Sequence, residues 1–245
     1  MIEDALIIMP AFNEAPVIRD TLAELIPFAG NVLVVDDGSS DGTSAAAAAG
    51  GASVLRLATN LGYAGALQAG FRYALRRTNF PFLLTFDADG QHDPAYLSAM
   101  LAPLREGRAD YVIGSRYLEA GPRAVSRPRE LGIRLFARAA SLAVGKRITD
   151  PTSGLTAMSR EVARVFLSEL FPPDYPDADV IIMLDRMGFR LSEVPVRIRP
   201  SRSQKSMHGG IFRPVYYVAK MSVSMIHLAT RGDLPAKRKE AQLAG

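Results

Sequence analysis

A short apolar run that leads directly into two aspartates limits the folds open to this chain more than any other feature. The run is Phe82–Phe86, and Asp87 and Asp89 follow it. A continuous apolar segment of this length is typical of a parallel strand that is covered on both faces. Asp93 and Pro94 then predict the N-cap and first position of a helix. The two carboxylates are therefore expected where a strand of an open α/β sheet ends, which is where such sheets bind ligands.

The two aspartates also have the spacing of a metal site. Asp87 and Asp89 are two residues apart, so they point to the same side of an extended backbone, and the amide of Gln91 follows. Such hard oxygen donors suit Mg²⁺ or Mn²⁺ held jointly with a diphosphate. Asp-Ala-Asp-Gly is also ordinary turn chemistry, so the surrounding chain has to decide between the two interpretations.

The rest of the chain alternates between predicted strands and helices. Strands are expected at residues 6–9, 32–35, 54–57, 82–86, 111–113 and 191–198, with the first ended by Pro10. Helices are expected at about 15–26, 45–49, 60–77, 130–144, 161–168 and 178–187. This order predicts βαβ units in a doubly wound, mostly parallel sheet. No linker or repeat divides residues 1–210, which are expected to form one domain.

Composition excludes several classes of protein. The 245 residues are 48% hydrophobic, enough for a large core, and include no cysteine, which excludes disulfides, thiolate zinc sites and cysteine nucleophiles. We find no signal peptide and no apolar stretch of the roughly 18 residues that a membrane span needs. The net charge of +4 favours phosphorylated ligands. No nucleic acid partner is expected, because no nucleic-acid-binding motif is present.

The C-terminal segment has the pattern of an amphipathic helix. Residues 211–231 place one narrow polar stripe on an otherwise apolar cylinder, made of Lys220, Ser224, His227 and Arg231. Such a helix lies on a membrane surface, packs into the core, or meets a second subunit in a homo-oligomer. Residues 232–245 are charged and rich in alanine, and we expect a flexible tail.

Four motifs occur together in the order and spacing of a known family. They are Pro10–Glu14, residues 34–43, Asn60–Gly65 and Asp87–His92. The combination resembles the family 2 glycosyltransferases, within them the branch of dolichol- and polyprenyl-phosphate sugar synthases. The resemblance covers residues 5–226 and continues through Gly114–Arg116, Asp150–Gly154, Glu193–Val196 and residues 202–206. It implies a GT-A fold, a GDP- or UDP-sugar donor, Mg²⁺ or Mn²⁺, and an inverting transfer.

The resemblance also implies roles for individual residues. The nucleotide sugar would contact Pro10, Ala11, Asn13, Glu14, Asp37, Gly65, Asp87, Ala88 and Asp89. The metal ligands would be Asp87, Asp89 and Gln91, with Asp89 central to catalysis. Phosphates of the donor or acceptor would meet Arg116, Arg202, Ser203 and Lys205. These roles suit the chemistry, because a metal and planar guanidinium groups stabilise the growing charge of a departing nucleoside diphosphate.

Structural alternatives exist for several of these residues. Asp37 is also a candidate N-cap of the helix that follows it. Asn13 and Glu14 have the pattern of a capping box. The alternating Arg197 and Arg199 match the solvent face of a strand.

The acceptor decides whether a general base is needed. A lipid phosphate is already an anion, whereas a sugar hydroxyl must lose a proton to a carboxylate. Asp177 and Asp179 lie where related transferases carry such a base, and Asp150 is a further candidate. Helix N-capping is the alternative for the first two, and turn formation for Asp150. The expected acceptor is a polyprenyl phosphate, used by a cytoplasmic protein attached peripherally to the cytoplasmic membrane face.

The main alternative is transfer to a sugar hydroxyl in polysaccharide or glycolipid synthesis. Two departures from the lipid-phosphate branch favour it: the loop that begins at Arg202 lacks the glycine of that branch, and its transmembrane helices are absent. A nucleotidyltransferase would need a glycine-rich basic loop where Pro10–Glu14 stands. A non-catalytic binder or scaffold would not need the intact pair Asp87 and Asp89.

Overall fold

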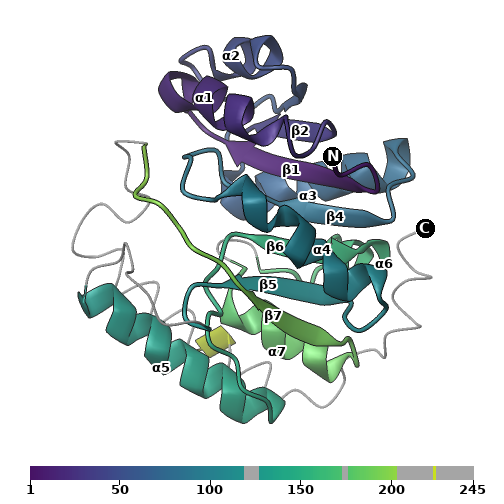
Figure 1. Cartoon of the computed structure of the whole chain (residues 1–245), viewed down its shortest axis with the longest axis vertical. Helices are drawn as coiled ribbons and strands as arrows, with labels where there is room; N and C mark the ends of the chain where they lie inside the picture. The colour runs from purple at the N-terminus through teal and green to yellow at the C-terminus, as the bar shows by residue number, and fades with distance from the viewer. Residues whose placement is uncertain (119–126, 173–175, 203–222, 225–245) are drawn as a thin grey trace.

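A seven-stranded sheet forms the centre of the computed structural model, which describes residues 1–118, 127–172, 176–202 and 223–224 (Figure 1). The strand order is β3-β2-β1-β4-β6-β5-β7. The strands are β1 (Ala5–Ala11), β2 (Val32–Asp36), β3 (Ser53–Arg56), β4 (Phe82–Thr85), β5 (Tyr111–Ser115), β6 (Thr156–Ser159) and β7 (Leu191–Pro195). The predicted C-terminal helix, apart from residues 223–224, the tail, and Ser203 and Lys205 lie outside the described residues.

Helices cover both faces of this sheet, as the alternating pattern predicted. One face packs against α3 (Gly62–Arg77), α5 (Arg127–Val144), α6 (Arg160–Val165) and α7 (Ala178–Arg186). The other packs against α1 (Ala15–Leu25), α2 (Thr43–Ala49) and α4 (Leu97–Arg105), the last preceded by the 3₁₀ turn η1 (Pro94–Tyr96). The doubly wound α/β architecture is confirmed. None of the helices in the described ranges is long and apolar enough to cross a membrane.

The sheet is mostly parallel, with one strand reversed. Strand β6 pairs antiparallel with both β4 and β5, whereas every other pairing is parallel. The sequence analysis did not predict β6, because four residues after a turn carry no clear periodicity. Since β6 runs backwards, it begins at the edge where the parallel strands end. The loop before it, Asp150–Gly154, is therefore delivered to the ligand-binding edge.

Every predicted strand differs from the structure by at least one residue at an end, and the differences at β1 and β7 are the largest. β1 does not stop at Pro10 but continues to Ala11. The backbone nitrogen of Pro10 faces β4, and the hydrogen-bond ladder between β1 and β4 has already ended there. The last bond there is Phe86 N–H to the carbonyl of Ile8, so the missing N–H of proline breaks nothing. β7 ends at Pro195, before the predicted limit of 198.

Candidate functional site

The candidate site lies along the edge where the parallel strands end. Asp37 follows β2, Asp87 follows β4, and Arg116 follows β5. Charges at this edge act on neighbouring groups. The charge of Arg116 helps to lower the pKa of Asp87, and the charge of Asp177, before α7, helps to raise the pKa of Tyr63 in α3. The sheet therefore assembles charged groups from distant parts of the chain.

Asp87 is held on both of its oxygens. The hydroxyl of Tyr63 donates to Oδ1 at 3.2 Å, and Nε2 of His92 lies 3.0 Å from Oδ2. His92 is buried and meets the ring of Phe86 edge-on. Burial raises the pKa of Asp87, but the bonds from His92 and Tyr63 and the charges of His92 and Arg116 outweigh it, so the pKa is lowered and the carboxylate stays ionised. The sequence analysis gave Tyr63 and His92 no role, although both lie in quoted motifs.

Gly154 fixes the remaining side of this carboxylate. A β-carbon added to Gly154 would lie 2.4 Å from Oδ2 of Asp87. Such a contact is far below van der Waals distance, so a larger residue here would require the carboxylate of Asp87 or the loop itself to shift. The loop before β6 is therefore packed directly against the carboxylate of Asp87.

Asp89 has the environment expected of a cation ligand. Its Oδ1 accepts the N–H of Gln91 at 3.0 Å. Burial and the charge of Asp87 raise the pKa of Asp89. Two carboxylates that repel each other this closely are stabilised by a cation between them. The side-chain amide of Gln91 finds a partner for both of its ends in one orientation. Its NH₂ group then donates to Oδ2 of Asp89, and its oxygen accepts the N–H of Ser201, each at 3.2 Å.

The donor set fits a divalent metal that is shared with a ligand. In the described part of the chain, no cluster of three or more His, Cys, Asp or Glu side chains could enclose a metal ion. Mg²⁺ does not need such a cluster, because it is usually bound through one or two carboxylates together with substrate phosphates and water. Asp87 and Asp89 match that arrangement, whereas the amide oxygen of Gln91 is directed to Ser201.

A segment beyond β7 runs beside the aspartate loop. The N–H of Arg199 donates to the carbonyl of Gln91 at 2.8 Å, and the N–H of Arg202 donates to that of Asp89 at 3.0 Å. Arg199 pairs with Glu24 at 2.7 Å and with Asp93 at 3.0 Å. Arg202 also pairs with Glu24. Arg199 is thus more than a solvent-facing strand residue, and Arg202 lies next to the aspartates, as its predicted phosphate role requires.

Arg116 and Asp150 form a buried, bidentate ion pair. Nε of Arg116 donates to Oδ2 of Asp150 at 2.6 Å and Nη2 donates to Oδ1 at 2.7 Å, while Nη2 also reaches Oγ1 of Thr152 at 2.8 Å. Asp150 is fully buried. The structure shows no hydrogen bond from Nη1 of Arg116 to any described residue, so one edge of the guanidinium is available to a phosphate.

We expect Arg116→Ala to destabilise the fold by about 3–5 kcal/mol, because it leaves Asp150 buried without its partner. The matched control is Arg190→Ala at the opposite end of β5. Arg190 binds Asp110 with the same two-pronged geometry, at 3.1 and 3.0 Å, but its side chain is 55% exposed. Its loss should cost clearly less than the loss of Arg116, because water solvates the exposed guanidinium and screens this pair. Urea unfolding of both variants measures the difference, and equal losses would contradict the prediction.

The predicted nucleotide loops are joined to each other by hydrogen bonds. Asn13 has a positive φ of 56°, its N–H donates to Oγ of Ser39 at 2.8 Å, and its Oδ1 accepts the N–H of Ser40 at 2.8 Å. The N–H of Glu14 donates to Oγ1 of Thr43 at 2.9 Å. Glu14 is the N-cap of α1 but makes no side-chain capping bond, so the capping box does not form.

Asp37 caps α3, and not α2, the helix that the N-cap interpretation of its sequence had named. Its two oxygens accept the N–H groups of Leu61 at 2.7 Å and Gly62 at 2.9 Å, at the start of α3 rather than α2. Burial and the charge of Asp36 help to raise its pKa. Other residues predicted to contact the nucleotide sugar lie in or beside these elements: Pro10 and Ala11 at the end of β1, Gly65 in α3, and Ala88 buried after β4.

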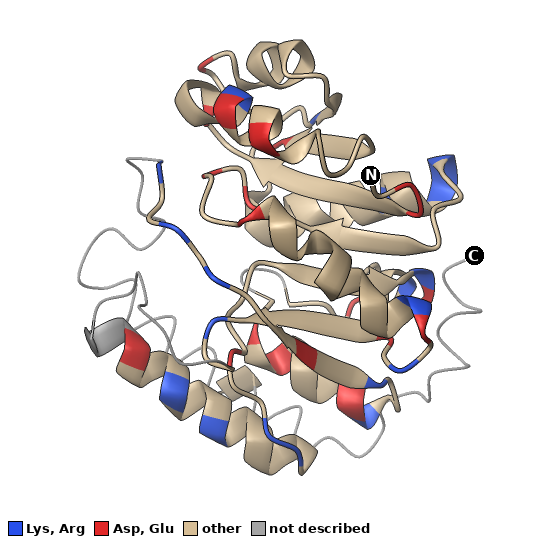
Figure 2. Ribbon diagram, in the orientation of Figure 1, with Lys and Arg blue, Asp and Glu red and all other residues tan. Residues whose placement is uncertain are grey.

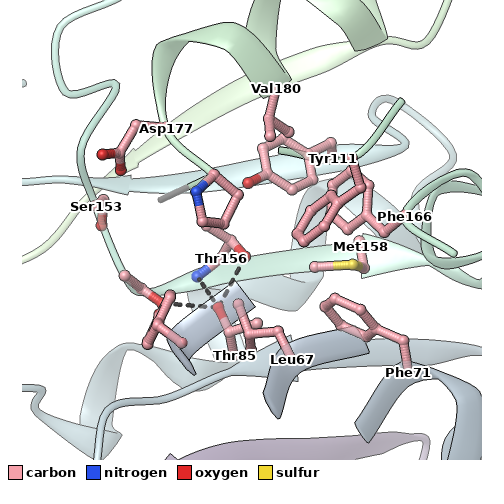
Figure 3. Close-up of a pocket in the computed structure, with 14 residues that line it drawn as sticks. Leu67, Phe71, Thr85, Tyr111, Ser153, Thr156, Met158, Phe166, Asp177 and Val180 are labelled. Atoms are coloured by element: carbon pink, nitrogen blue, oxygen red, sulfur yellow. Dashed lines mark hydrogen bonds between the residues drawn. The ribbon is translucent and has the colours of Figure 1, made fainter. Parts of the chain in front are cut away.

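The two candidate bases before and in α7 have different surroundings. Asp179 is fully buried; its Oδ1 accepts the N–H groups of Asp177 and Val180 at 3.1 and 3.0 Å, and its Oδ2 accepts the hydroxyl of Ser224 at 2.8 Å. Asp177 is the N-cap residue of α7 but makes no side-chain capping bond. It lines a cavity of about 40 Å³ whose polar end includes Ser153 and whose other end is aromatic (Figure 3).

Comparison with known proteins identifies relatives over most of the chain. The family described as glycosyl transferase family 2 matches residues 6–167. An undecaprenyl-phosphate mannosyltransferase of Micrococcus luteus is 34% identical, over 84% of this chain and 88% of the relative. A polyprenol monophosphomannose synthase of Mycolicibacterium smegmatis is 34% identical, over 78% of this chain and 76% of the relative.

The fold also matches solved structures. A glucosyl-3-phosphoglycerate synthase of Mycobacterium tuberculosis, in complex with Mn²⁺, UDP and phosphoglyceric acid, superposes with a TM-score of 0.68 at 21% identity. The match covers 94% of this chain and 79% of that chain. At this level of identity, the likeness establishes the fold alone, and it agrees with the GT-A fold expected from the sequence.

Proposed function

We propose, from the premise that the chain belongs to glycosyl transferase family 2, that it transfers a sugar from a UDP- or GDP-sugar to a polyprenyl phosphate. The observation that carries this proposal is the joint placement of Asp87, Asp89 and the open edge of Arg116 at one end of the sheet. Two relatives support the acceptor: one is named for undecaprenyl phosphate, and the other for the synthesis of polyprenol monophosphomannose. A structural neighbour that binds Mn²⁺ with UDP supports the metal and the diphosphate.

The site residues divide the work of the reaction. Asp89 and Asp87 would hold Mg²⁺ or Mn²⁺, which acts as a Lewis acid on the departing diphosphate. Tyr63, His92 and Gly154 fix Asp87 so that its carboxylate needs no reorientation. The stretches around Asn13 and Asp37 form the proposed nucleotide site.

Arg116 supplies a guanidinium of fixed orientation for a phosphate of the donor or the acceptor. Asp150 occupies its Nε edge and leaves Nη1 open. The bonds of Arg116 occupy both oxygens of Asp150, and those of Asp179 accept backbone N–H groups nearby and the hydroxyl of Ser224. Neither carboxylate is well placed to take a proton, which favours an acceptor that needs no general base.

One observation keeps a sugar hydroxyl as the second candidate acceptor. Asp177 lines the cavity beside Tyr63, and its charge acts on Tyr63 and Arg116. A carboxylate in that place could accept the proton of a hydroxyl group. The Asp177→Asn variant separates the two candidates: it should keep transfer to undecaprenyl phosphate within about threefold, and abolish transfer to a hydroxyl acceptor.

The direct test of the proposed function offers radiolabelled UDP-glucose, UDP-N-acetylglucosamine and GDP-mannose with Mn²⁺. The acceptors are undecaprenyl phosphate in vesicles and an oligosaccharide with free hydroxyl groups. Label in the lipid fraction, lost when EDTA is added, supports the proposal. Label only on the oligosaccharide would transfer support to the second candidate, and label on neither would overturn both.

Helix α5 supports attachment to a membrane surface. Leu131, Leu135 and Leu142 are 62%, 58% and 85% exposed and recur on one outward face. Exposed Arg134 and Arg138 lie on the same helix, and Figure 2 shows basic residues recurring along it. An exposed apolar stripe with basic neighbours is typical of a helix that lies on anionic lipid. We therefore propose that the protein acts peripherally at the cytoplasmic membrane face.

Replacing all three leucines by serine should weaken binding to vesicles of phosphatidylglycerol and phosphatidylcholine by about tenfold or more. Their side chains are largely in water already, so unfolding by urea should change little. Phe28→Ser, a change at another exposed apolar residue, is the control and should bind vesicles like the parent. Sedimentation with the vesicles measures the effect, and unchanged binding of the triple variant would exclude α5 as the contact.

A further inference from the structure

A carboxylate on the edge strand of the sheet holds the loop that carries Asp150. Glu193 lies on β7, in register with Ile113 of β5. Its Oε1 accepts the backbone N–H of Thr149 at 2.9 Å and that of Asp150 at 3.0 Å. Its Oε2 accepts the hydroxyl of Thr149 at 2.9 Å and shares the N–H of Thr149 at 3.0 Å. One side chain thus binds two consecutive backbone N–H groups of a loop that has no regular structure of its own.

These contacts continue to the site. The hydroxyl of Thr149 also lies 2.5 Å from that of Ser115, next to Arg116 in the chain. Asp150 then receives the N–H of Arg116 at 2.9 Å in addition to its guanidinium. A continuous set of bonds therefore leads from Glu193 through the loop to Arg116.

We propose that Glu193 is a positioning residue, which sets the orientation of Arg116 by fixing the backbone of Thr149 and Asp150. The direction of the Asp150 carboxylate depends on the backbone angles of its loop, and the direction of the guanidinium depends on that carboxylate. A misplacement of about 1 Å in a group that binds a reacting phosphate can cost a hundredfold in rate. The consequence for catalysis rests on the proposed function, whereas the link between Glu193 and Arg116 does not.

Two variants separate geometry from charge. In Glu193→Gln, the amide oxygen can take the place of Oε1 and accept both backbone N–H groups, and its NH₂ donates to the hydroxyl of Thr149, so only the second bond of the Thr149 N–H, to Oε2, is lost. Glu193→Ala removes all of these bonds. A positioning role therefore predicts that glutamine preserves the arrangement and alanine does not. Urea unfolding verifies that both variants are folded.

The first readout is the NMR signal of the Arg116 Nε–H, which a bond to a buried carboxylate protects from exchange with water. We expect a protected signal in the parent and in Glu193→Gln, and its loss in Glu193→Ala. The Nε–H of Arg190, bound to Asp110 at the far end of β5, is the internal control and should be unchanged in all three. A protected Arg116 signal in Glu193→Ala would overturn the proposal, as would its loss in Glu193→Gln.

The second readout is kcat/KM for sugar transfer to undecaprenyl phosphate. We expect a loss of about 10- to 100-fold in Glu193→Ala, the range measured for residues that orient metal ligands, and less than about threefold in Glu193→Gln. Full activity in folded Glu193→Ala would overturn the role in catalysis. A parent with no transferase activity would refute the proposed function instead, and the NMR comparison would still decide whether Glu193 positions Arg116.

Discussion

Replacing Asp89 by alanine should lower kcat for sugar transfer by about 10³-fold. We propose that Asp89 and Asp87 share a cation with a diphosphate, and burial and the charge of Asp87 raise the pKa of Asp89. Alanine removes one carboxylate of the pair, and Asp87, which stays bonded to Tyr63 and His92, cannot supply the missing oxygen ligand. The same variant should lose Mn²⁺-dependent binding of UDP or GDP, measured by calorimetry.

The matched control for this prediction is Asp93→Ala. Asp93 lies in the same loop, but its carboxylate caps η1 through the N–H of Ala95 at 3.0 Å and pairs with Arg199. Its loss should reduce stability by about 1 kcal/mol and leave kcat within a few-fold of the parent. Undiminished transfer by Asp89→Ala, or an equal loss in both variants, would refute the assignment of the metal to this pair.

The second large effect is expected from adding one methyl group at Gly154. In Gly154→Ala the new β-carbon would lie 2.4 Å from Oδ2 of Asp87, so the carboxylate must move away from His92 or the loop before β6 must shift. Either change displaces a proposed metal ligand, and we expect kcat/KM to fall by about a hundredfold. Steady-state kinetics at saturating Mn²⁺ measures the loss.

Gly30→Ala controls for the general effect of replacing a loop glycine. A β-carbon on Gly30 would meet only Sδ of Met1 at 3.6 Å, an ordinary contact, and Gly30 does not have a positive φ. This variant should be as active as the parent. An active Gly154→Ala enzyme would show that the position of Asp87 tolerates displacement, and the role given to its rigid surroundings would be wrong.

Local sequence patterns were sufficient for the elements that obey simple periodicity. The apolar run before Asp87 predicted β4, and Asp93 and Pro94 predicted the start of a helix; the structure confirms the strand and the cap, which opens the 3₁₀ turn η1 that leads into α4. The same patterns placed Asp37, Asp87 and Arg116 at one sheet edge, because each follows a strand. Strand β6 was not predicted, because its position between β4 and β5 is decided by tertiary pairing.

The partners of each site residue could not be predicted from the sequence. Asp37 caps a helix that begins 25 residues later, and Arg116 pairs with a carboxylate 34 residues away. Such contacts depend on which loops the sheet order brings together, and local propensity carries no information about them. Glu193 stood in a quoted motif, yet only the folded loop shows that its carboxylate binds the N–H groups of Thr149 and Asp150.

The reversed strand β6 has a consequence for how specificity can diverge. It separates a parallel group, β3-β2-β1-β4, from the parallel pair β5 and β7. The proposed nucleotide loops belong to the first group, and the Arg116 anchorage to the second. The proposed roles therefore predict that substitutions around β5 and β7, other than at Arg116 and at Gly154 beside Asp87, change what receives the sugar and leave the loops proposed for the donor in place.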